Sequence, residues 1–259
     1  NQLTYVIDGM PVSDQLTGAF ANAVDPSIVQ TVELFTGNVP AEYGNKVSGV
    51  AVITTRSGMG SGRRFSGSTQ VTAAQFDTLA SVTQVAGGTD KWGYFGSFNA
   101  LKSNRYLDQV SLDNLHNGGN SERSFFRADY QASARDQLRF SFITGRSSFQ
   151  IANLRSQHAH GQDQRQALRD ISFSTGWLHT INSRTTVDAM ASFRKADAEL
   201  IPSAGDFPVT ASQDRSSSTL TTGVRLNRDT GRHSLRTGVD YQHFPVRERF
   251  TFGTADFLF

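Results

Sequence analysis

The chain has 259 residues, enough for one large domain or two ordinary ones. Its net charge of +2, without a basic run interleaved with aromatic residues, argues against a nucleic-acid partner. The lack of cysteine excludes a disulfide scaffold, a thiolate zinc site and a cysteine nucleophile. No segment approaches the roughly 18 consecutive apolar residues of a membrane helix, but a barrel strand, apolar on one face only, would escape that search.

Residues 1–58 are predicted to form a small α+β unit. The stretch "TYVIDG" predicts a short strand that ends in a turn at Asp8-Gly9. Asp25 followed by Pro26 is typical of a helix start, with the aspartate as N-cap. Two further strands are expected in "VELF" and "GVAVITT", with a glycine-punctuated loop between them.

From about residue 65 the pattern changes to apolar and polar residues in strict alternation. In "FRADYQASA", Phe126, Ala128 and Tyr130 fall on one face and Arg127 and Asp129 on the other. The same period recurs in "QLRFSF", "LTTGVRLN" and "LRTGVDYQ", which predicts nine or ten half-buried antiparallel strands. The charged candidates on the polar faces are Arg127, Asp129, Arg139, Arg225 and Arg236.

The connections between these strands also alternate. Short ones are expected at 87–90, 134–137, 181–184 and 228–231, and long polar ones at 104–123, 150–168 and 200–217. Tight turns at one end and long loops at the other are typical of a transmembrane β-barrel. A soluble β-sandwich, whose turns have mixed lengths, is the alternative fold.

The motifs of residues 5–58 resemble the second half of the plug domain of TonB-dependent outer-membrane transporters. An Asp-Gly step after a strand, a Val-Glu strand ending in glycine, a Tyr-Gly turn and an apolar strand ending in Thr-x-Ser-Gly occur in that order. The residues that carry these motifs are Asp8, Gly9, Glu33, Gly37, Ala41, Glu42, Tyr43, Gly44, Gly49, Ser57 and Gly58. The chain departs from the family at Thr36, where many members have arginine, and at Ser48-Gly49, where a Gly-Gly step is usual.

The resemblance implies that residues 1–58 are the C-terminal half of a plug and residues 59–259 the N-terminal part of an outer-membrane barrel. Family barrels have roughly 22 strands, so the chain is expected to be a fragment. The Ala-Glu-Tyr-Gly form is similar to members with an extra carboxypeptidase-regulatory-like N-terminal domain. Because a buried carboxylate needs a partner, Glu33 is expected to face one of the barrel arginines.

The implied function is import of a scarce ligand across the outer membrane of a Gram-negative-type bacterium, driven by energy-coupled plug movement. The implied partners are outer-membrane lipid, a small ligand or oligosaccharide, and a TonB-type energy-coupling protein that binds a segment outside this sequence. No cofactor and no enzymatic activity are expected. A passive porin-like or structural barrel, and a soluble or secreted β-rich adhesin or enzyme, are the alternatives.

Two further groups of residues have weaker interpretations. His158 and His160 are weak candidates for a metal site, but their place in a polar loop without a third ligand favours two solvated histidines. Trp92, Tyr94 and Trp177 are expected in an aromatic girdle at the membrane interface. If the plug enters from the periplasmic side, counting strands from residue 65 places every long connection outside the cell.

Overall fold

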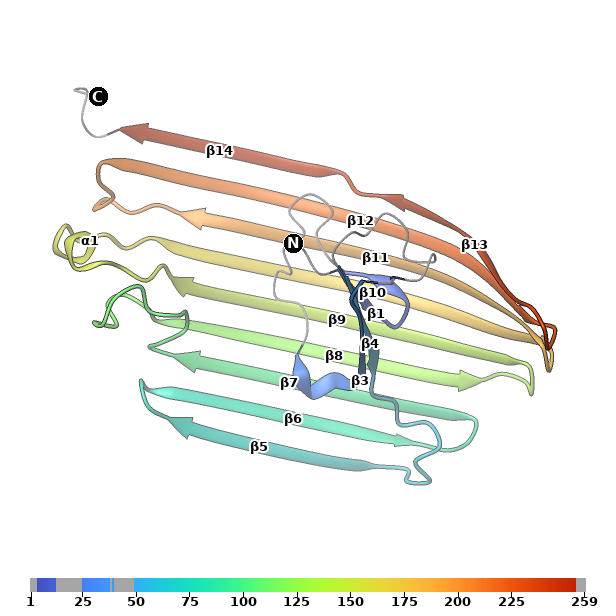
Figure 1. The fold of residues 1–259 in the computed structure, drawn as a ribbon. Coiled ribbons are helices and arrows are strands. Elements are labelled where there is room, and N and C mark those ends of the chain that lie inside the picture. Colours follow the sequence, from blue (N-terminus) through green and yellow to red (C-terminus); the bar gives the residue numbers. More distant parts are fainter. Residues whose placement is uncertain (1–3, 13–24, 38, 40–48, 255–259) are drawn as a thin grey trace.

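A computed structural model describes residues 4–12, 25–37, 39 and 49–254, which form two sheets (Figure 1). The smaller sheet has the strand order β2-β1-β4-β3, and the larger one has ten strands. The smaller sheet lies against one face of the larger one, over its middle strands (Figure 1). We call the smaller sheet the plug sheet and the larger one the wall. Ala41, Glu42, Tyr43 and Gly44 lie outside the described residues.

The plug sheet contains four short strands and one helical turn. Its strands are β1 (Thr4–Ile7), β2 (Met10–Pro11), β3 (Val29–Phe35) and β4 (Val50–Thr55), and β1 runs parallel to β4. The predicted helix start is confirmed as the single 3₁₀ turn η1 (Pro26–Ile28), which the side chain of Asp25 caps by accepting a hydrogen bond from the Ser27 N–H at 2.9 Å.

The wall is an antiparallel meander, as the alternation predicted. Its strands are β5 (Ser66–Ala74), β6 (Thr78–Gly88), β7 (Trp92–Ser103), β8 (Gly119–Gln131), β9 (Asp136–Gln150), β10 (Arg165–Asn182), β11 (Thr185–Ile201), β12 (Val209–Asp229), β13 (Ser234–His243) and β14 (Val246–Thr254). β13 and β14 pair with successive halves of β12, so they continue each other as one interrupted strand. The wall therefore has nine strand positions made of ten segments.

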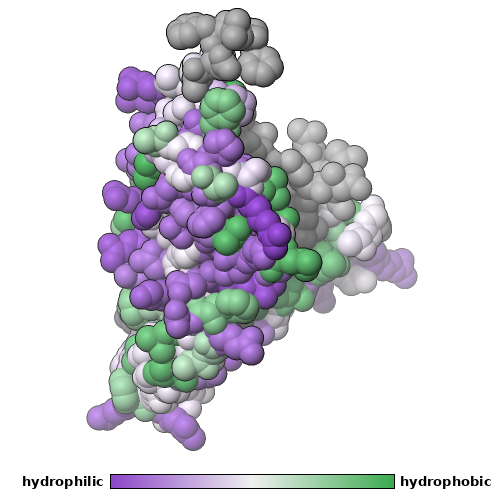
Figure 2. Space-filling model, turned by 90° about the vertical axis from the view of Figure 1, so that its left-hand side faces the viewer, coloured by the Kyte–Doolittle hydropathy of each residue, from purple (hydrophilic) through white to green (hydrophobic). Residues whose placement is uncertain are grey.

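The two ends of the wall differ in their connections (Figure 1). The segments 89–91, 132–135, 183–184 and 230–233 lie at one end, which we call the short-turn end. The segments 75–77, 104–118, 151–164 and 202–208 lie at the other, which we call the long-loop end. The surface of the long-loop end is mostly hydrophilic (Figure 2). It carries the helix α1 (Arg155–Ala159), and no helix among the described residues is long and apolar enough to span a membrane.

One predicted long connection is wrong. The range 200–217 was expected to be a loop, but β11 extends to Ile201 and β12 begins at Val209, which leaves only 202–208 between them. The polar stretch 209–217 pairs with β14, and 213–217 pairs with β11 as well, so ladder hydrogen bonds rather than apolar packing hold it extended. A membrane crossing needs only about 9–11 residues of strand. The 21-residue β12 is longer, so part of it can be polar on both faces.

The two faces of the wall differ in what covers them. Phe126, Tyr130 and Phe140 are exposed on the face away from the plug sheet. On the opposite face, Phe95 and Phe125 are each only 4 % exposed because they pack against Ile28 of the plug sheet. These two inward phenylalanines interrupt the polar face that the sequence predicted. They give the contact between the sheets a small apolar centre.

Candidate functional site

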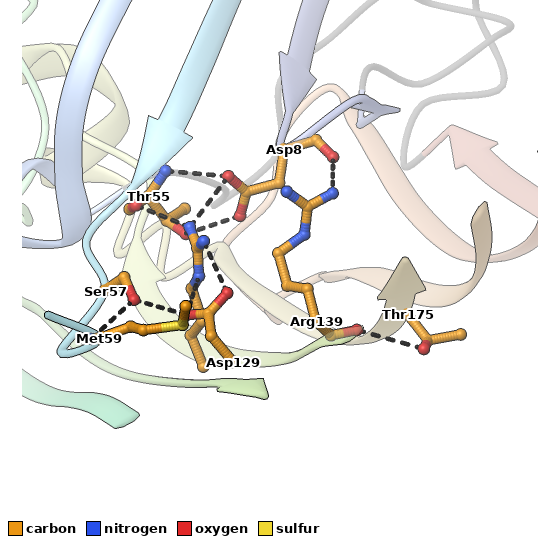
Figure 3. A network of polar contacts seen from close by, with 8 residues as sticks. Asp8, Thr55, Ser57, Met59, Asp129, Arg139 and Thr175 are labelled. Carbon is orange, nitrogen blue, oxygen red and sulfur yellow. Dashed lines mark hydrogen bonds and ion pairs between the residues drawn. The ribbon is translucent and has the colours of Figure 1, made fainter. Parts of the chain in front are cut away.

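The contact between the plug sheet and the wall contains a buried polar network centred on Asp8 (Figure 3). Asp8 follows β1 with a φ of 48°, and Gly9 follows with a φ of 89°. This turn directs the carboxylate of Asp8 at the end of β4. There it accepts hydrogen bonds from the Thr55 N–H at 3.0 Å and the Thr55 hydroxyl at 2.6 Å.

Arg127 of β8 joins this turn to the wall. Its Nη1 donates to the backbone oxygen of Thr55 at 2.8 Å and to the Thr55 hydroxyl at 3.0 Å, and it lies 3.4 Å from Oδ1 of Asp8. Nε and Nη2 of Arg127 each donate at 2.9 Å to a different oxygen of Asp129. The side chains of Arg127, Asp8 and Asp129 are 10 %, 3 % and 1 % exposed. A planar guanidinium, with five N–H donors in a fixed fork, can bind the plug sheet with some donors and Asp129 with the others.

The network extends to the linker after β4 and to a second arginine. The Ser57 hydroxyl donates to Asp129 at 2.6 Å and accepts from the Met59 N–H at 3.1 Å. Arg139 of β9 donates through Nη2 to the backbone oxygen of Asp8 at 2.8 Å. Two arginines thus face two aspartates, which balances the formal charge of a site that is largely screened from water.

A second polar contact surrounds η1. Asn99 of β7 donates to the Asp25 carboxylate at 2.6 Å, and the hydroxyls of Ser27 and Ser97 lie 3.0 Å apart. Gln84 of β6 donates to the backbone oxygen of Ser27 at 2.9 Å. This contact and the Asp8 network accompany the apolar centre formed by Ile28, Phe95 and Phe125. The plug sheet is therefore held to the wall by hydrogen bonds and ion pairs together with two apolar clusters, the second of which packs Ile7, Val12 and Ile53 near Ile143 of β9.

Glycines allow the linker between the sheets to lie directly on the β6–β7 hairpin. A Cβ on Gly58 would lie 2.2 Å from the backbone oxygen of Tyr94, and one on Gly93 would lie 2.1 Å from the backbone nitrogen of Met59. Hydrogen bonds fix the same contact, from the Gly60 N–H to Thr89 at 3.1 Å and from the Gly88 N–H to Arg63 at 2.8 Å. Only residues without a side chain permit this close approach. Gly58 and its neighbours therefore fix where the plug sheet is joined to the wall.

The remaining polar-face and glycine candidates lie outside the network. Arg225 approaches Asp240 at 3.7 Å, and Arg236 is exposed on β13. Gly37 and Gly49 have φ values of 92° and 145°, so both adopt conformations that favour glycine.

Within the described residues Glu33 does not meet a barrel arginine, and its expected pairing stays a prediction. β3 is an edge strand of the described plug sheet, and Glu33 is exposed on it. Among the described residues no ion pair joins it to an arginine. The plug carboxylate that meets Arg127 is that of Asp8.

The histidine candidates and the aromatic candidates lie at opposite ends of the wall. His158 lies on α1 and His160 directly after it, with the His160 ring 2.7 Å from the Ser156 oxygen. No group of three or more metal-ligating side chains occurs within the described ranges. Trp92 and Tyr94 stack with ring centroids 5.9 Å apart, and Trp177 donates to Asp136 at 3.1 Å. These three aromatic residues lie toward the short-turn end, and Trp92 and Trp177 are exposed on the face away from the plug sheet.

Several residues of the site were not predicted. Thr55 belongs to the Thr-x-Ser-Gly motif together with Ser57, so the motif could have indicated that Thr55 is part of the site. Gln84, Asn99 and Phe95 carried no such signal, because their roles depend on contacts with a segment more than 50 residues away in the sequence.

No protein-family model matches the sequence, and no curated protein is similar enough to count as a match. Solved structures do match. The siderophore receptor PiuA from Acinetobacter baumannii superimposes with a TM-score of 0.72 at 13 % identity, over 98 % of this chain and 41 % of that one. The copper transporter OprC gives 0.74 at 13 % identity, over 96 % and 39 %. The ferric-catecholate import receptor Fiu from E. coli K12 gives 0.70 at 12 % identity, over 93 % and 42 %.

The chain thus spans about two fifths of the length of these receptors, with nearly all of its own residues in the match. Because the matches cover 93–98 % of this chain, they include both sheets described above. This chain therefore has the plug-and-wall fold of TonB-dependent outer-membrane receptors.

Proposed function

We propose that the chain is part of a TonB-dependent outer-membrane receptor that imports a scarce ligand by energy-coupled movement of its plug. Residues 1–58 are the C-terminal half of the plug, and residues 59–259 are the N-terminal part of the barrel. The wall face that carries Arg127, Asp129 and Arg139 is the lumen face. The opposite face, with Trp92 and Trp177, contacts the lipid of the outer membrane of a Gram-negative bacterium.

The observation that carries this proposal is the buried polar network in the contact between the sheets. Each hydrogen bond there contributes only about 0.5–1.5 kcal/mol net, because water replaces it when the groups separate. An apolar interface of the same extent would lose roughly 25 cal/mol for each Å² that it exposed to water. A plug seated by the Asp8 network can therefore leave the wall when pulled, provided that water enters the gap.

The partners follow from the same proposal. A TonB-type energy-coupling protein pulls the plug through a segment outside this sequence, and the transported species is a small ligand or an oligosaccharide. The carboxypeptidase-regulatory-like subgroup remains a prediction. The role requires no covalent chemistry, so the protein is proposed not to be an enzyme and to need no cofactor.

A disulfide lock tests the proposal in the full-length receptor. Ser27 and Ser97 face each other across the contact with their hydroxyls 3.0 Å apart, so cysteines in both places can link plug to wall. Uptake by intact cells is screened with ferric citrate, a ferric catecholate and copper, the species named for similar receptors. We expect one of them to enter only when the coupling protein is present, not to enter when the disulfide forms, and to enter again after reduction.

The Ser27→Cys single variant is the control, because it cannot form the link and should import normally. Uptake without the coupling protein would instead show a passive pore. Uptake that continues through the oxidised lock would show that the plug does not have to move.

A further inference from the structure

The connections at the long-loop end are joined to one another by hydrogen bonds. Segment 151–164 contacts segment 104–118 through the Asn153 N–H, which donates to the Leu115 oxygen at 3.0 Å. It contacts segment 202–208 through the Asp163 N–H, which donates to the Ser203 hydroxyl at 2.9 Å. Segment 151–164 therefore lies between the other two segments and is hydrogen-bonded to both.

His116 lies where segments 104–118 and 151–164 meet. Its side chain is only 11 % exposed, and its φ of 54° is unusual for a residue with a side chain. Nδ1 lies 3.0 Å from the backbone oxygen of Ile151, and Nε2 lies 2.5 Å from Oδ1 of Asp163. Both ring nitrogens therefore face oxygen atoms of segment 151–164.

The two oxygen atoms are both acceptors. A backbone carbonyl can only accept a hydrogen bond, and so can an ionised carboxylate. Nε and Nη2 of Arg165 bind the two Asp163 oxygens at 3.0 and 3.1 Å, and the hydrogen bond from Arg165 lowers the pKa of Asp163 despite the opposing effect of burial. A neutral imidazole has one N–H and can satisfy only one of the two acceptors, whereas the imidazolium satisfies both.

We propose that His116 is a proton-dependent latch, which holds segment 104–118 against segment 151–164 while its imidazole is charged. When the proton is lost, one nitrogen presents a lone pair to an acceptor, and that contact must open. The latch therefore closes as the pH falls and opens as it rises. The inference does not depend on plug movement or on import, because it concerns only the contacts between these two segments.

The neighbouring charged groups do not produce the same response. Asp113 and Arg155 form an ion pair across the same two segments, with Nη2 and Oδ1 3.0 Å apart. The hydrogen bond from Arg155 lowers the pKa of Asp113, so this pair remains charged in mildly acidic and mildly basic solution. Asp206 accepts from Ser203 and Gln164 rather than from His116. His116 is the group at this contact whose two ring nitrogens both face acceptors, so an opening between pH 5.5 and 8.5 is assigned to it.

The test uses the full-length receptor in lipid nanodiscs, with spin labels on cysteines introduced at Val110 and Ala159. Both positions are exposed, one in each segment, and the 259 residues contain no other cysteine. Electron–electron double resonance measures the distance between the labels at pH 5.5 and at pH 8.5. We expect a narrow distribution at pH 5.5 that becomes at least twofold broader at pH 8.5. The same width at both pH values would overturn the latch.

Three variants show whether the response belongs to His116. His116→Gln should remove the difference between the two pH values, and the control His158→Gln should keep it. Asp163→Asn should remain narrow at both pH values, because its amide can donate to the lone pair of a neutral His116. If His116→Gln does not assemble, Asp163→Asn decides, since a distribution that still broadens at pH 8.5 would contradict the assignment.

Discussion

At the scale of single residues, Arg127 joins the plug sheet to the wall through side-chain contacts with both. Its guanidinium binds Thr55 and Asp8 on the plug side and Asp129 on the wall side. Removing one partner of a buried ion pair costs about 3–5 kcal/mol, because the other charge is left without compensation.

Arg127→Met in the full-length receptor should therefore loosen β4 more than it affects the wall. The methionine has a similar length but no hydrogen-bond donor. Asp8 and Asp129 therefore remain buried without the positive charge of Arg127 that compensates them. Hydrogen exchange followed by mass spectrometry should show amides of residues 50–58 exchanging about 100-fold faster, the equivalent of nearly 3 kcal/mol.

The matched control is Arg135→Met. Arg135 is exposed in the 132–135 connection, and its guanidinium forms none of the side-chain bonds found within the described part of the chain. The Arg135→Met variant should leave the hydrogen exchange of the amides in residues 50–58 unchanged. Equal exchange in the two variants would show that Arg127 does not seat the plug sheet.

At the scale of elements, the linker after β4 and the β6–β7 hairpin form one fixed unit. The linker backbone approaches Gly87, Gly88 and Gly93 so closely that a methyl group on any of them would displace it. Backbone hydrogen bonds hold it in the same position. The C-terminal end of the plug sheet is thereby held at the short-turn end of the wall.

Gly93→Ala should displace this linker, because its Cβ would lie 2.1 Å from Met59 N and 2.4 Å from Met59 Cα. We expect slower barrel assembly, measured by heat-modifiable gel mobility of the full-length receptor, and faster proteolysis at residues 59–64. Gly96→Ala, in the same strand, is the control, since its closest contact is a valine methyl group at 3.2 Å that can move. The same behaviour in both variants would mean that the close approach at Gly93 is not needed.

The strands were largely predictable from the sequence, and the partners across the contact were not. Alternation is local, so the segment 126–131 revealed both the strand and its two faces, although the alternation continued past the end of β8 at Gln131. Arg127 and Asp8 are 119 positions apart, and the four arginines on polar faces had equivalent local sequences. His116 was missed for a related reason: its two acceptors belong to another connection, and no periodic pattern marks a residue in a loop. β12 was mistaken for a loop in part because pairing with its neighbours, not an apolar face, holds it extended.

At the scale of the whole molecule, the two ends of the wall differ in the residues they carry. The short-turn end carries the linker and the aromatic residues Trp92, Tyr94 and Trp177. The long-loop end is mostly hydrophilic and carries the His116 contact (Figure 2). If the plug enters from the periplasm, strand parity places the short-turn end inside and the long-loop end outside.

Labelling of single cysteines on intact cells tests this orientation most directly. The full-length receptor would carry one cysteine at Leu112, Ala159, Arg135 or Thr230, all exposed positions in a segment that has no cysteine of its own. A membrane-impermeant maleimide should react at Leu112 and Ala159 in intact cells, and at Arg135 and Thr230 only after the outer membrane is disrupted. Reaction at Arg135 and Thr230 but not at Leu112 and Ala159 in intact cells would contradict the plug-and-wall orientation.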